Sequence, residues 1–519
     1  MRSRLGSWAG LAAPLAVLVL HAPRFIRSGI SVYDGGLYLT LARFTDLGHL
    51  PYRDLWTLYG PGPPVYSSIV MDLFGRGLGP QKIALFLIQI LIVAAAYLLA
   101  RRFVAAWTAG SLAALVASVG YAVHFQQTLV LLLWGLWFVL RASEDAGRAP
   151  RRLTIAAVLF GLSFWGRFEF VVVGIALVVG LWFFARGRLV RQRRMLLAGL
   201  APPVLFIVYA ITIVGWDRAW LNLVEYPFFR YADDACRGLP AAWGVAFDSL
   251  TAPFRGELWT TEGLILWTAT FVAPIVAVLC LVIGWRGRRS EPLRAFAIAA
   301  LGFLLLTLWI EHRPRASESP YPLLPVMAVG AAVLLGALAA RRPRAARWSS
   351  AGIAAVIALT LVTSWIAPAT RAWTAWPPYD PLLGWEGGRV EGLYDERVWA
   401  DVASVVQGRV PRGEEIFVAL TDNRARTHAN APIFYWFTDR PPASRFIEFN
   451  PCLTDTAPVQ REIVEDLAGV DVVILTTFFP DPIREGPAIL NDHLATEFEP
   501  VYQGELPQDQ GVVVLERQP

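Results

Sequence analysis

Residues 82–100 read KIALFLIQILIVAAAYLLA, and the only charge in this stretch is the ammonium of Lys82 at its start. A helix of about 20 apolar residues crosses the hydrocarbon core of a bilayer, so this stretch has the length and composition of a membrane span. Comparable stretches recur on both sides of it, and 55% of the 519 residues are apolar. The pattern predicts a polytopic α-helical membrane protein, because a water-soluble core does not need so many uncharged stretches.

The hydropathy pattern predicts about eleven membrane spans. They cover residues 8–23, 82–100, 104–122, 125–140, 153–166, 169–185, 195–215, 263–284, 295–310, 321–339 and 349–367. The first span is short and follows Arg2 and Arg4, which is also typical of a signal peptide. No small-residue cleavage site follows it, so we expect it to remain uncleaved.

Arginine clusters predict the orientation of these spans. The clusters fall in every second connection, at residues 101–102, 141–152, 186–194, 286–294 and 341–347. Because basic residues concentrate in cytoplasmic loops, we expect a multi-pass membrane protein with its N-terminus inside and its C-terminus outside. The clusters also explain the pI near 9.2, so the charge does not indicate a nucleic-acid partner.

The composition changes after the last span. Helix-like stretches between residues 394 and 498 alternate there with short β-rich runs at 415–420, 471–476 and 511–516. This pattern predicts an extracytoplasmic soluble α/β domain at residues 370–519, which is long enough to build its own core. The transmembrane domain then covers residues 1–369, and its first exterior loop covers residues 24–81.

Two motifs mark the first exterior loop: Tyr33-Asp34-Gly35-Gly36-Leu37-Tyr38 and Pro51-Tyr52-Arg53-Asp54-Leu55-Trp56. A carboxylate beside low-dielectric lipid becomes a stronger base, so Asp34 is a candidate general base. Alternatively, Asp34 caps the amphipathic helix that follows it, by accepting hydrogen bonds from free backbone N–H groups. Arg53 either contacts a phosphate or sugar of the substrate or forms an ion pair with Asp54 that fixes the loop.

The order of these motifs resembles the GT-C superfamily of integral-membrane glycosyltransferases, within it the bacterial group related to protein O-mannosyltransferases and aminoarabinose transferases. The resemblance rests on a first span, an Asp-Gly-x-x-Tyr context, Gly-x-x-Pro-Tyr-Arg-Asp-x-Trp at residues 48–56 and a Pro-rich entry to the next helix. It implies a location in the bacterial cytoplasmic (inner) membrane, a polyprenyl-phosphate sugar as donor and two interfacial helices in the first exterior loop. The acidic residue that acts as catalytic base in this family corresponds to Asp34. The family often has a second acid directly after it, whereas this chain has Gly35, which argues against a two-carboxylate or metal-bridged mechanism.

Further candidates lie at the exterior ends of other spans. Arg167 and Glu169 occupy a hairpin between two spans, where charges are costly unless they are paired or functional. They either pair within the hairpin or shape the donor pocket. Arg313 or Arg315, which precede Tyr321 at the start of the tenth span, is the candidate ligand of the donor phosphate, because a guanidinium binds phosphate oxygens in pairs.

Other polar residues of the exterior loops have weaker signals. His124 either contacts sugar hydroxyls or is a hydrogen-bonded interfacial histidine. Asp233 and Asp234 provide oxygen ligands for a divalent cation, although adjacent aspartates in a loop are more often solvated. Cys236 and Cys452 both fall on the exterior side, where a disulfide between them is chemically allowed. The predicted substrate-binding set comprises Tyr38, Arg53, Asp54, His124, Arg167, Glu169, Arg313, Arg315 and Tyr321.

These features predict a metal-independent, inverting transfer of a sugar from a polyprenyl phosphate to an extracytoplasmic glycan, lipid or protein acceptor. A lipid-linked saccharide transporter and a non-catalytic envelope scaffold are the alternatives, together with a polysaccharide polymerase or ligase. A transporter is expected to carry ionisable residues within its spans or internal repeats. The predicted spans are almost free of charge, which favours the enzyme.

Overall fold

The computed structural model describes residues 10–27, 30–31, 34–57, 59–75, 77–118, 123–168, 170–185, 189–230, 271–312, 323–361, 390–391, 396–421, 430–450, 452–476, 487–506 and 510–519. The chain divides into two compact units, each assembled from three separate segments. The first unit comprises Met1–Ile26, Ile83–Phe206 and Pro240–Pro377. The second comprises Arg27–Lys82, Ile207–Leu239 and Pro378–Pro519.

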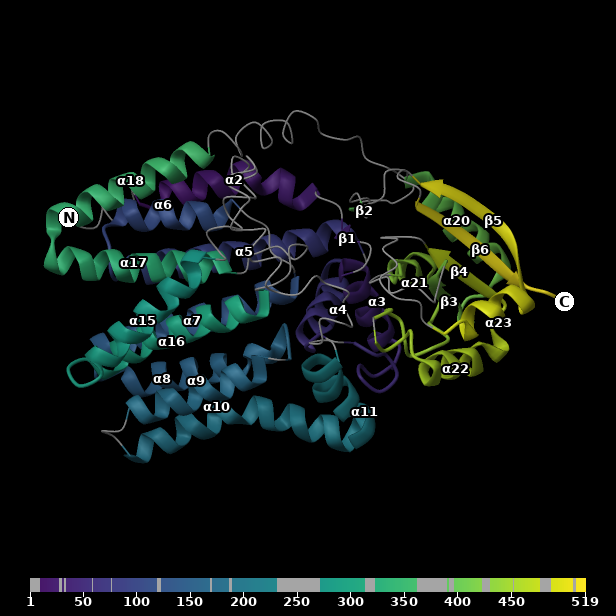
Figure 1. Cartoon of the computed structure of the whole chain (residues 1–519), viewed down its shortest axis with the longest axis horizontal. Coiled ribbons are helices and arrows are strands. Elements are labelled where there is room, and N and C mark those ends of the chain that lie inside the picture. The colour runs from purple at the N-terminus through teal and green to yellow at the C-terminus, as the bar shows by residue number, and fades with distance from the viewer. Residues whose placement is uncertain are drawn as a thin grey trace. The chain divides into compact units, whose positions relative to one another are not determined.

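Helices from every predicted span build the first unit (Figure 1). They are α2 (Ala12–Arg27), α5 (Leu78–Ala100), α6 (Ala106–Ala117), α7 (Val123–Glu144), α8 (Ala149–Gly161), α9 (Phe170–Phe184), α10 (Leu189–Tyr209), α15 (Ala273–Gly287), α16 (Pro292–His312), α17 (Leu323–Arg341) and α18 (Pro343–Leu361). A 3-10 turn, η1 (Ser163–Trp165), separates α8 from α9. The ends of α2, α5 and α10 extend into segments of the second unit.

Length and hydropathy identify membrane spans among these helices. Five stretches of the described residues are long and apolar enough to cross a bilayer: Gly79–Ala100, Phe125–Glu144, Arg193–Val214, Pro292–Trp309 and Leu323–Arg341. Shorter apolar helices occur at Ala12–Pro23, Ala106–Ala117, Phe170–Phe184 and Ala273–Gly287. The predicted class, a polytopic helical membrane protein, is therefore confirmed, while the number of eleven crossings stays a prediction.

Small residues bring the helices of the first unit close together. A Cβ atom placed on Gly302 of α16 would lie 2.6 Å from the carbonyl oxygen of Ala277 in α15, so only glycine permits this approach. Lipid provides no hydrophobic drive for helix association, and close van der Waals packing through small residues replaces it. The core of the unit is a continuous apolar cluster to which α5, α7, α16 and α17 contribute.

The second unit combines the first exterior loop with the C-terminal part of the chain. Its helices are α3 (Asp34–Asp46), α4 (Gly62–Phe74), α11 (Trp216–Trp220), α20 (Glu396–Arg409), α21 (Ile433–Thr438), α22 (Ala457–Asp466) and α23 (Ile489–Glu497), with the π-helices η2 (Ala210–Val214) and η3 (Leu221–Arg230) and the 3-10 turn η9 (Leu467–Gly469). A short parallel pair joins β1 (Ile30–Ser31) to β2 (Val390–Glu391). This pair and the shared apolar core connect sequence segments that lie more than 300 residues apart.

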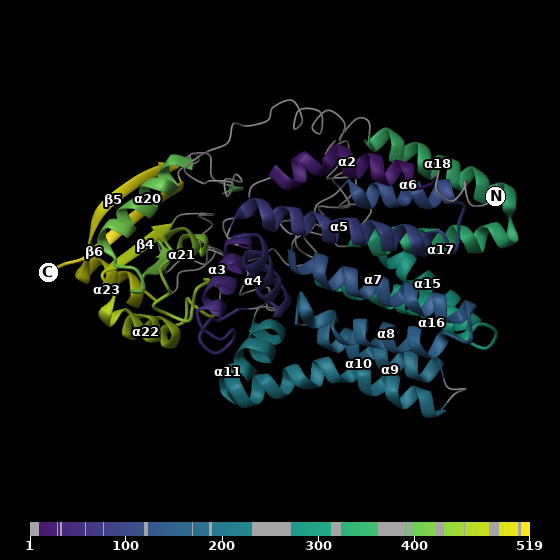
Figure 2. The same cartoon turned by 180° about the vertical axis from the view of Figure 1, so that it is seen from behind.

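A four-stranded sheet forms the C-terminal part of this unit (Figure 2). Its strands are β3 (Phe417–Leu420), β4 (Val472–Thr476), β5 (Phe498–Leu506) and β6 (Gln510–Arg517), in the order β3-β4-β6-β5. β3 and β4 are parallel, the other pairs are antiparallel, and α20 packs against β5 and β6. The three predicted β-rich runs correspond to β3, β4 and β6. The sequence pattern missed β5, because Pro500 and Gly504 interrupt its apolar alternation.

Helix α3 packs against α21 within the second unit. The Thr40 hydroxyl donates a hydrogen bond to the carbonyl of Pro432 at 2.8 Å, and Arg43 Nε contacts Asp439 Oδ1 at 2.8 Å. The predicted interfacial helix has an apolar face formed by Leu37, Leu41, Phe44 and Leu47. The first three are fully buried in the core of this unit, whereas Leu47, which follows the end of α3, is exposed. In the structure most of this face is therefore covered by protein.

We expect Gly36→Ala to destabilise the second unit. A Cβ atom at this position would lie 2.5 Å from Cβ of Ile433 and 2.8 Å from its backbone nitrogen, and backbone cannot move aside cheaply. Overpacking of this kind costs about 1–3 kcal/mol. Thermal unfolding of the purified chain in detergent, followed by tryptophan fluorescence, measures the effect.

A matched substitution isolates the packing contribution. Gly408 lies in α20, and a Cβ atom there would meet no described atom within 4 Å. Gly408→Ala should therefore raise stability by up to about 1 kcal/mol through helix propensity alone. If the two variants unfold at the same temperature, the close contact between α3 and α21 is not present in the protein.

Candidate functional site

Asp34 is the first residue of α3. Backbone N–H groups at the start of a helix lack intrahelical partners, and the helix dipole favours a negative charge there. The next two residues, Gly35 and Gly36, are buried, so protein encloses the start of this helix. The side chain of Asp34 lies outside the described residues, and its roles as general base or as helix cap both stay predictions.

The motif loop, residues 50–57, holds an aromatic residue in an unusual backbone conformation. Tyr52 has φ +68°, in the left-handed region that bulky side chains rarely adopt. Its N–H donates to the carbonyl of Leu55 at 2.7 Å, and its hydroxyl donates to the carbonyl of Tyr59 at 2.6 Å. The side chain is only 1% exposed. Strained residues of this kind persist only where the surroundings determine the conformation, and they cluster at functional sites.

Arg53 and Asp54 form a two-bond ion pair at the surface of this loop. Arg53 Nε and Nη2 lie 2.8 and 2.7 Å from the two carboxylate oxygens of Asp54. Asp54 Oδ2 also accepts the N–H of Leu50 at 2.9 Å, which closes the turn. The hydrogen bonds from Arg53 lower the pKa of Asp54, and the N–H of Leu50 adds to this effect. The alternative interpretation, an ion pair that fixes the loop, is thus present, while substrate contact by Arg53 stays a prediction.

We expect Asp54→Asn to loosen this turn in a pH-dependent way. Because the folded-state pKa of Asp54 is lowered, its contribution to stability is present above the ordinary carboxyl pKa of about 4 and is lost as pH falls through the lowered value. The variant should unfold more easily than the native chain at pH 7, by at most about 1 kcal/mol because the pair is largely exposed, and this difference should shrink as the pH is lowered toward 3. Thermal unfolding at both pH values checks this, with Asp72→Asn at an exposed position of α4 as the control. A difference that does not change with pH would contradict it.

Three side chains from residues 209–222 hold the backbone of the motif loop. We call them the carbonyl clamp, because they donate to three consecutive carbonyl groups. Tyr209 Oη donates to Pro51 O at 3.2 Å, Asn222 Nδ2 to Tyr52 O at 2.8 Å, and Arg218 Nη1 to Arg53 O at 2.8 Å. Asn222 is fully buried, whereas the bond of Arg218 is exposed. The clamp therefore fixes the left-handed conformation of Tyr52 from outside the loop.

The clamp residues lie in or next to two π-helices, with Arg218 in the short helix α11 between them. Tyr209 ends α10, η2 follows it, and Asn222 lies in η3. π-Helices are rare overall, and those that occur often lie at functional sites. Sequence reasoning did not identify these residues, since they lie 158–170 positions from the loop. The available signal was Asn222 as a polar residue within the largely apolar run 219–224.

The motif loop also contacts the C-terminal part of the second unit. Trp56 is fully buried, its backbone N–H donates to the carbonyl of Arg445 at 2.8 Å, and its ring meets that of Tyr226 edge-on at 5.3 Å between centroids. Tyr38 of α3 is 1% exposed and packs edge-on against Tyr59, 5.1 Å between centroids. Tyr59 thus connects α3 with the motif loop. In the structure Tyr38 packs against Tyr59. A contact between Tyr38 and the substrate stays a prediction.

A second polar group lies in the first unit, where α7 begins beside the turn between α8 and α9. The guanidinium carbon of Arg167 lies 4.9 Å from the ring centroid of Phe125. The hydroxyl of Thr128 donates to the carbonyl of Ser163 at 3.0 Å, which joins the same two elements. Gln127 is 4% exposed, and its amide forms no hydrogen bond within the described part of the chain.

The structure therefore brings Arg167 to the first turn of α7, which also contains His124. The side chain of His124 lies outside the described residues. The remaining predicted site residues lie outside them entirely: Glu169, Arg313, Arg315, Tyr321, Asp233 and Asp234.

The cysteines are partly described. Cys452 is disulfide-bonded, and Cys280 is free and buried in α15. Cys236, the predicted partner of Cys452 and the third cysteine of the sequence, lies outside the described residues.

Comparisons with known proteins place this geometry in a known fold. Residues 60–216 match the family model described as dolichyl-phosphate-mannose-protein mannosyltransferase. The structure is similar to that of ArnT from Cupriavidus metallidurans bound to undecaprenyl phosphate, with a TM-score of 0.53, 14% identity, and coverage of 98% of this chain and 97% of ArnT. It is also similar to the Archaeoglobus fulgidus oligosaccharyltransferase tethered with an acceptor peptide, with a TM-score of 0.52, 16% identity, and coverage of 90% of this chain and 69% of that one. No curated protein sequence matches the chain. The predicted resemblance to the GT-C glycosyltransferases is confirmed, and the chain has their fold.

Proposed function

We propose that this chain transfers a sugar from a polyprenyl-phosphate donor to an extracytoplasmic envelope glycan, lipid or protein. The observation that carries the proposal is the fold, which follows that of ArnT bound to undecaprenyl phosphate over nearly the whole length of both chains. The match of residues 60–216 to a mannosyltransferase family supports the same class of enzyme. The motifs of the first exterior loop are the third, independent support.

The proposed reaction inverts the configuration at the anomeric carbon. Asp34 accepts the proton of the acceptor hydroxyl, whose oxygen forms the new bond to the anomeric carbon on the face opposite the leaving group. The bond from the anomeric carbon to the phosphate oxygen breaks, and its electron pair leaves with the polyprenyl phosphate. Arg313 or Arg315 compensates the charge of that phosphate. A phosphate compensated in this way leaves without the help of a metal ion.

The carbonyl clamp and the motif loop serve this reaction by holding the start of α3. The carbonyl of Tyr59 accepts a hydrogen bond from the hydroxyl of Tyr52, and the ring of Tyr59 packs against that of Tyr38. Tyr38 lies in α3, one turn after Asp34. A general base must lie within hydrogen-bond reach of the proton it removes, so small displacements of this turn reduce the rate. We assign to the loop the role of positioning α3.

The C-terminal part of the second unit is the proposed acceptor-binding region. It shares an apolar core with α3 and is attached to it through Thr40 and Arg43. The candidate base and the C-terminal residues therefore belong to one compact unit, in which a bound acceptor has a defined relation to α3.

Mass spectrometry of lipid-linked sugars and envelope glycans tests the function. A host that lacks this chain should lose one glycan modification and accumulate the corresponding polyprenyl-phosphate sugar, and both changes should revert when the chain is restored. If the glycans are unchanged and an intact lipid-linked sugar remains on one face of the membrane, the chain is a transporter and the proposal is wrong.

A further inference from the structure

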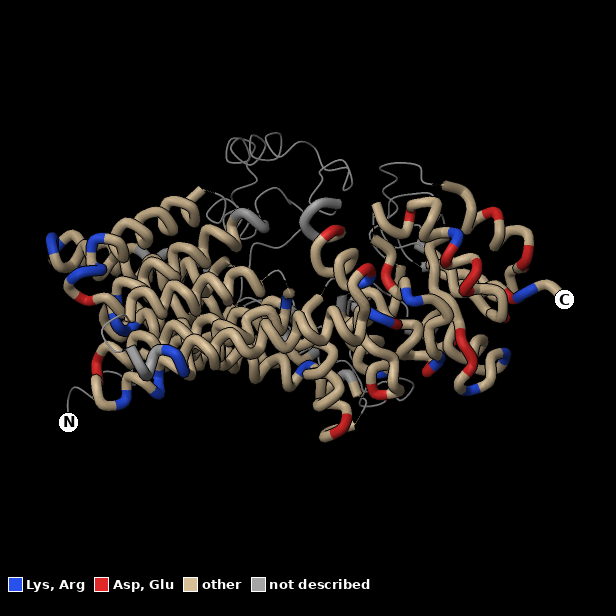
Figure 3. Tube along the Cα trace, turned by 90° about the horizontal axis from the view of Figure 1, so that it is seen from below, with Lys and Arg blue, Asp and Glu red and all other residues tan. Residues whose placement is uncertain are grey.

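A cavity of about 800 Å³ opens in the first unit. It lies at the end of the helices where arginine residues gather (Figure 3). Residues of four segments line it: the α5–α6 connection, the end of α7 with the start of α8, the end of α9, and the α15–α16 connection with the start of α16. These segments carry arginine clusters from which the orientation was predicted. We call this space the basic cavity, and its polar lining consists mainly of Arg101, Arg102, Arg294, Glu144 and Glu291.

The charges of the lining leave one guanidinium without an acidic partner. Glu144 pairs with Arg102 and, at 2.9 Å, with Arg141, while Arg294 contacts Glu291 at 3.1 Å. Arg101 donates to the carbonyl of Val104 at 3.0 Å, and no carboxylate of the described residues pairs with it. The lining therefore has an excess of positive charge.

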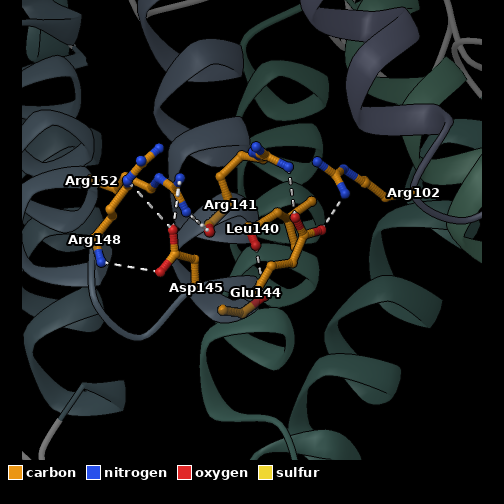
Figure 4. A network of polar contacts seen from close by, with 8 residues as sticks. Arg102, Leu140, Arg141, Glu144, Asp145, Arg148 and Arg152 are labelled. Atoms are coloured by element: carbon orange, nitrogen blue, oxygen red, sulfur yellow. Dashed lines mark hydrogen bonds and ion pairs between the residues drawn. The ribbon is translucent and has the colours of Figure 1, made fainter.

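The surroundings of the cavity increase this excess. Next to Glu144, which pairs with Arg141, the guanidinium groups of Arg148 and Arg152 share the single carboxylate of Asp145 (Figure 4). Arg152 Nη2 lies 3.3 Å and Arg148 Nε 3.9 Å from Asp145 Oδ2. An anion that enters the cavity therefore meets several guanidinium groups that carboxylates neutralise only in part.

The rest of the lining is apolar. It consists largely of Phe103, Leu140, Leu153, Phe184 and Leu293. The guanidinium carbon of Arg294 lies 5.5 Å from the ring centroid of Phe103, so a cationic and an apolar surface meet directly. A small hydrophilic anion gains no binding energy from the apolar part of the lining, whereas a molecule with a charged headgroup and a hydrocarbon chain is complementary to both surfaces.

We propose that the basic cavity binds the phosphate headgroup of an anionic membrane lipid, with its acyl chain against the apolar wall. Arginine-rich loops lie on the cytoplasmic side, and basic pockets between membrane helices on that side bind anionic headgroups. The cavity lies at the opposite end of α7 from Gln127, about 25 Å away along the helix, so it is separate from the candidate site. The proposal does not depend on the sugar-transfer reaction.

Lipid binding to the purified full chain in detergent tests this proposal. The probes are dioctanoyl phosphatidylglycerol, dioctanoyl phosphatidylcholine and free glycerol phosphate, and thermal stabilisation reports binding. The native chain should bind phosphatidylglycerol more tightly than the other two. Arg101→Gln combined with Arg102→Gln and Arg294→Gln should weaken this binding about tenfold or more.

Two further variants keep the result interpretable. Arg341→Gln with Arg344→Gln and Arg347→Gln removes the same charge from exposed positions outside the cavity, and its binding should equal that of the native chain. Glu144→Gln with Glu291→Gln removes the competing carboxylates and should tighten binding. Equal binding of phosphatidylglycerol and phosphatidylcholine, or an equal loss in both arginine variants, would overturn the proposal. Glycerol phosphate binding as tightly as the lipid would overturn the assignment of a lipid.

Discussion

Asp34→Asn should reduce sugar transfer by about 10²- to 10⁴-fold, the usual contribution of a general base. Asparagine cannot accept a proton at neutral pH, but it caps a helix as well as aspartate does. The variant should therefore insert and fold like the native chain and still fail to restore the missing glycan modification. Mass spectrometry of envelope glycans from a host that carries only this variant measures the loss.

The same helix provides the control for this experiment. Asp46 ends α3, is exposed and accepts a hydrogen bond from the hydroxyl of Ser68. Asp46→Asn makes the same chemical change at the far end of α3 and should restore the modification fully. If Asp34→Asn restores it as well as Asp46→Asn does, Asp34 is a helix cap and the proposed base is wrong.

Asn222→Ala should have the second largest effect, a loss of about 10- to 100-fold in kcat with a smaller change in KM. The amide of Asn222 is a buried donor to the carbonyl of Tyr52, and the substitution removes this hydrogen bond from the left-handed residue. The expected cost in stability is about 1–3 kcal/mol. Steady-state kinetics and thermal unfolding of the purified variant measure the two effects separately.

Arg218→Ala is the comparison within the carbonyl clamp. Arg218 donates to the neighbouring carbonyl of Arg53, but its bond is exposed and water replaces it when the side chain is lost. This variant should keep most of the activity and stability of the native chain. Equal effects of the two substitutions would mean that the clamp does not act through the buried carbonyl of Tyr52.

Local sequence patterns predicted most of the fold. Apolar stretches such as 82–100 identified the helices, because a bilayer requires about 20 apolar residues in one segment. The C-terminal runs around residues 417 and 472 identified β3 and β4, since buried strands are short and β-branched. β5 was missed because Pro500 and Gly504 are turn formers in isolation.

Local sequence patterns could not predict which segments group into one compact unit. The sequence predicted a soluble domain at residues 370–519, while contacts in the structure group Arg27–Lys82 and Ile207–Leu239 with its larger part. The residue that makes this possible is Gly36, whose missing side chain lets α3 meet Ile433. A contact between residues almost 400 positions apart leaves no trace in local periodicity.

The sequence likewise predicted one part of the candidate site and missed another. The pair of Arg53 and Asp54 was predictable because the two residues are neighbours in the chain. The left-handed backbone of Tyr52 and its support by Asn222 were not, since local patterns give no reason for an aromatic residue to adopt that conformation. The prediction thus identified the loop and the structure identified what holds it.

The most direct test of the account is a balance of products with the purified chain. Proteoliposomes that contain the native chain, a polyprenyl-phosphate sugar and an envelope extract as acceptor should release free polyprenyl phosphate in a ratio of about one to one with the transferred sugar. Proteoliposomes with Asp34→Asn should release neither. If the native chain moves the intact polyprenyl-phosphate sugar between leaflets, and neither free polyprenyl phosphate nor a glycosylated acceptor forms, the chain is not a glycosyltransferase and the account is wrong.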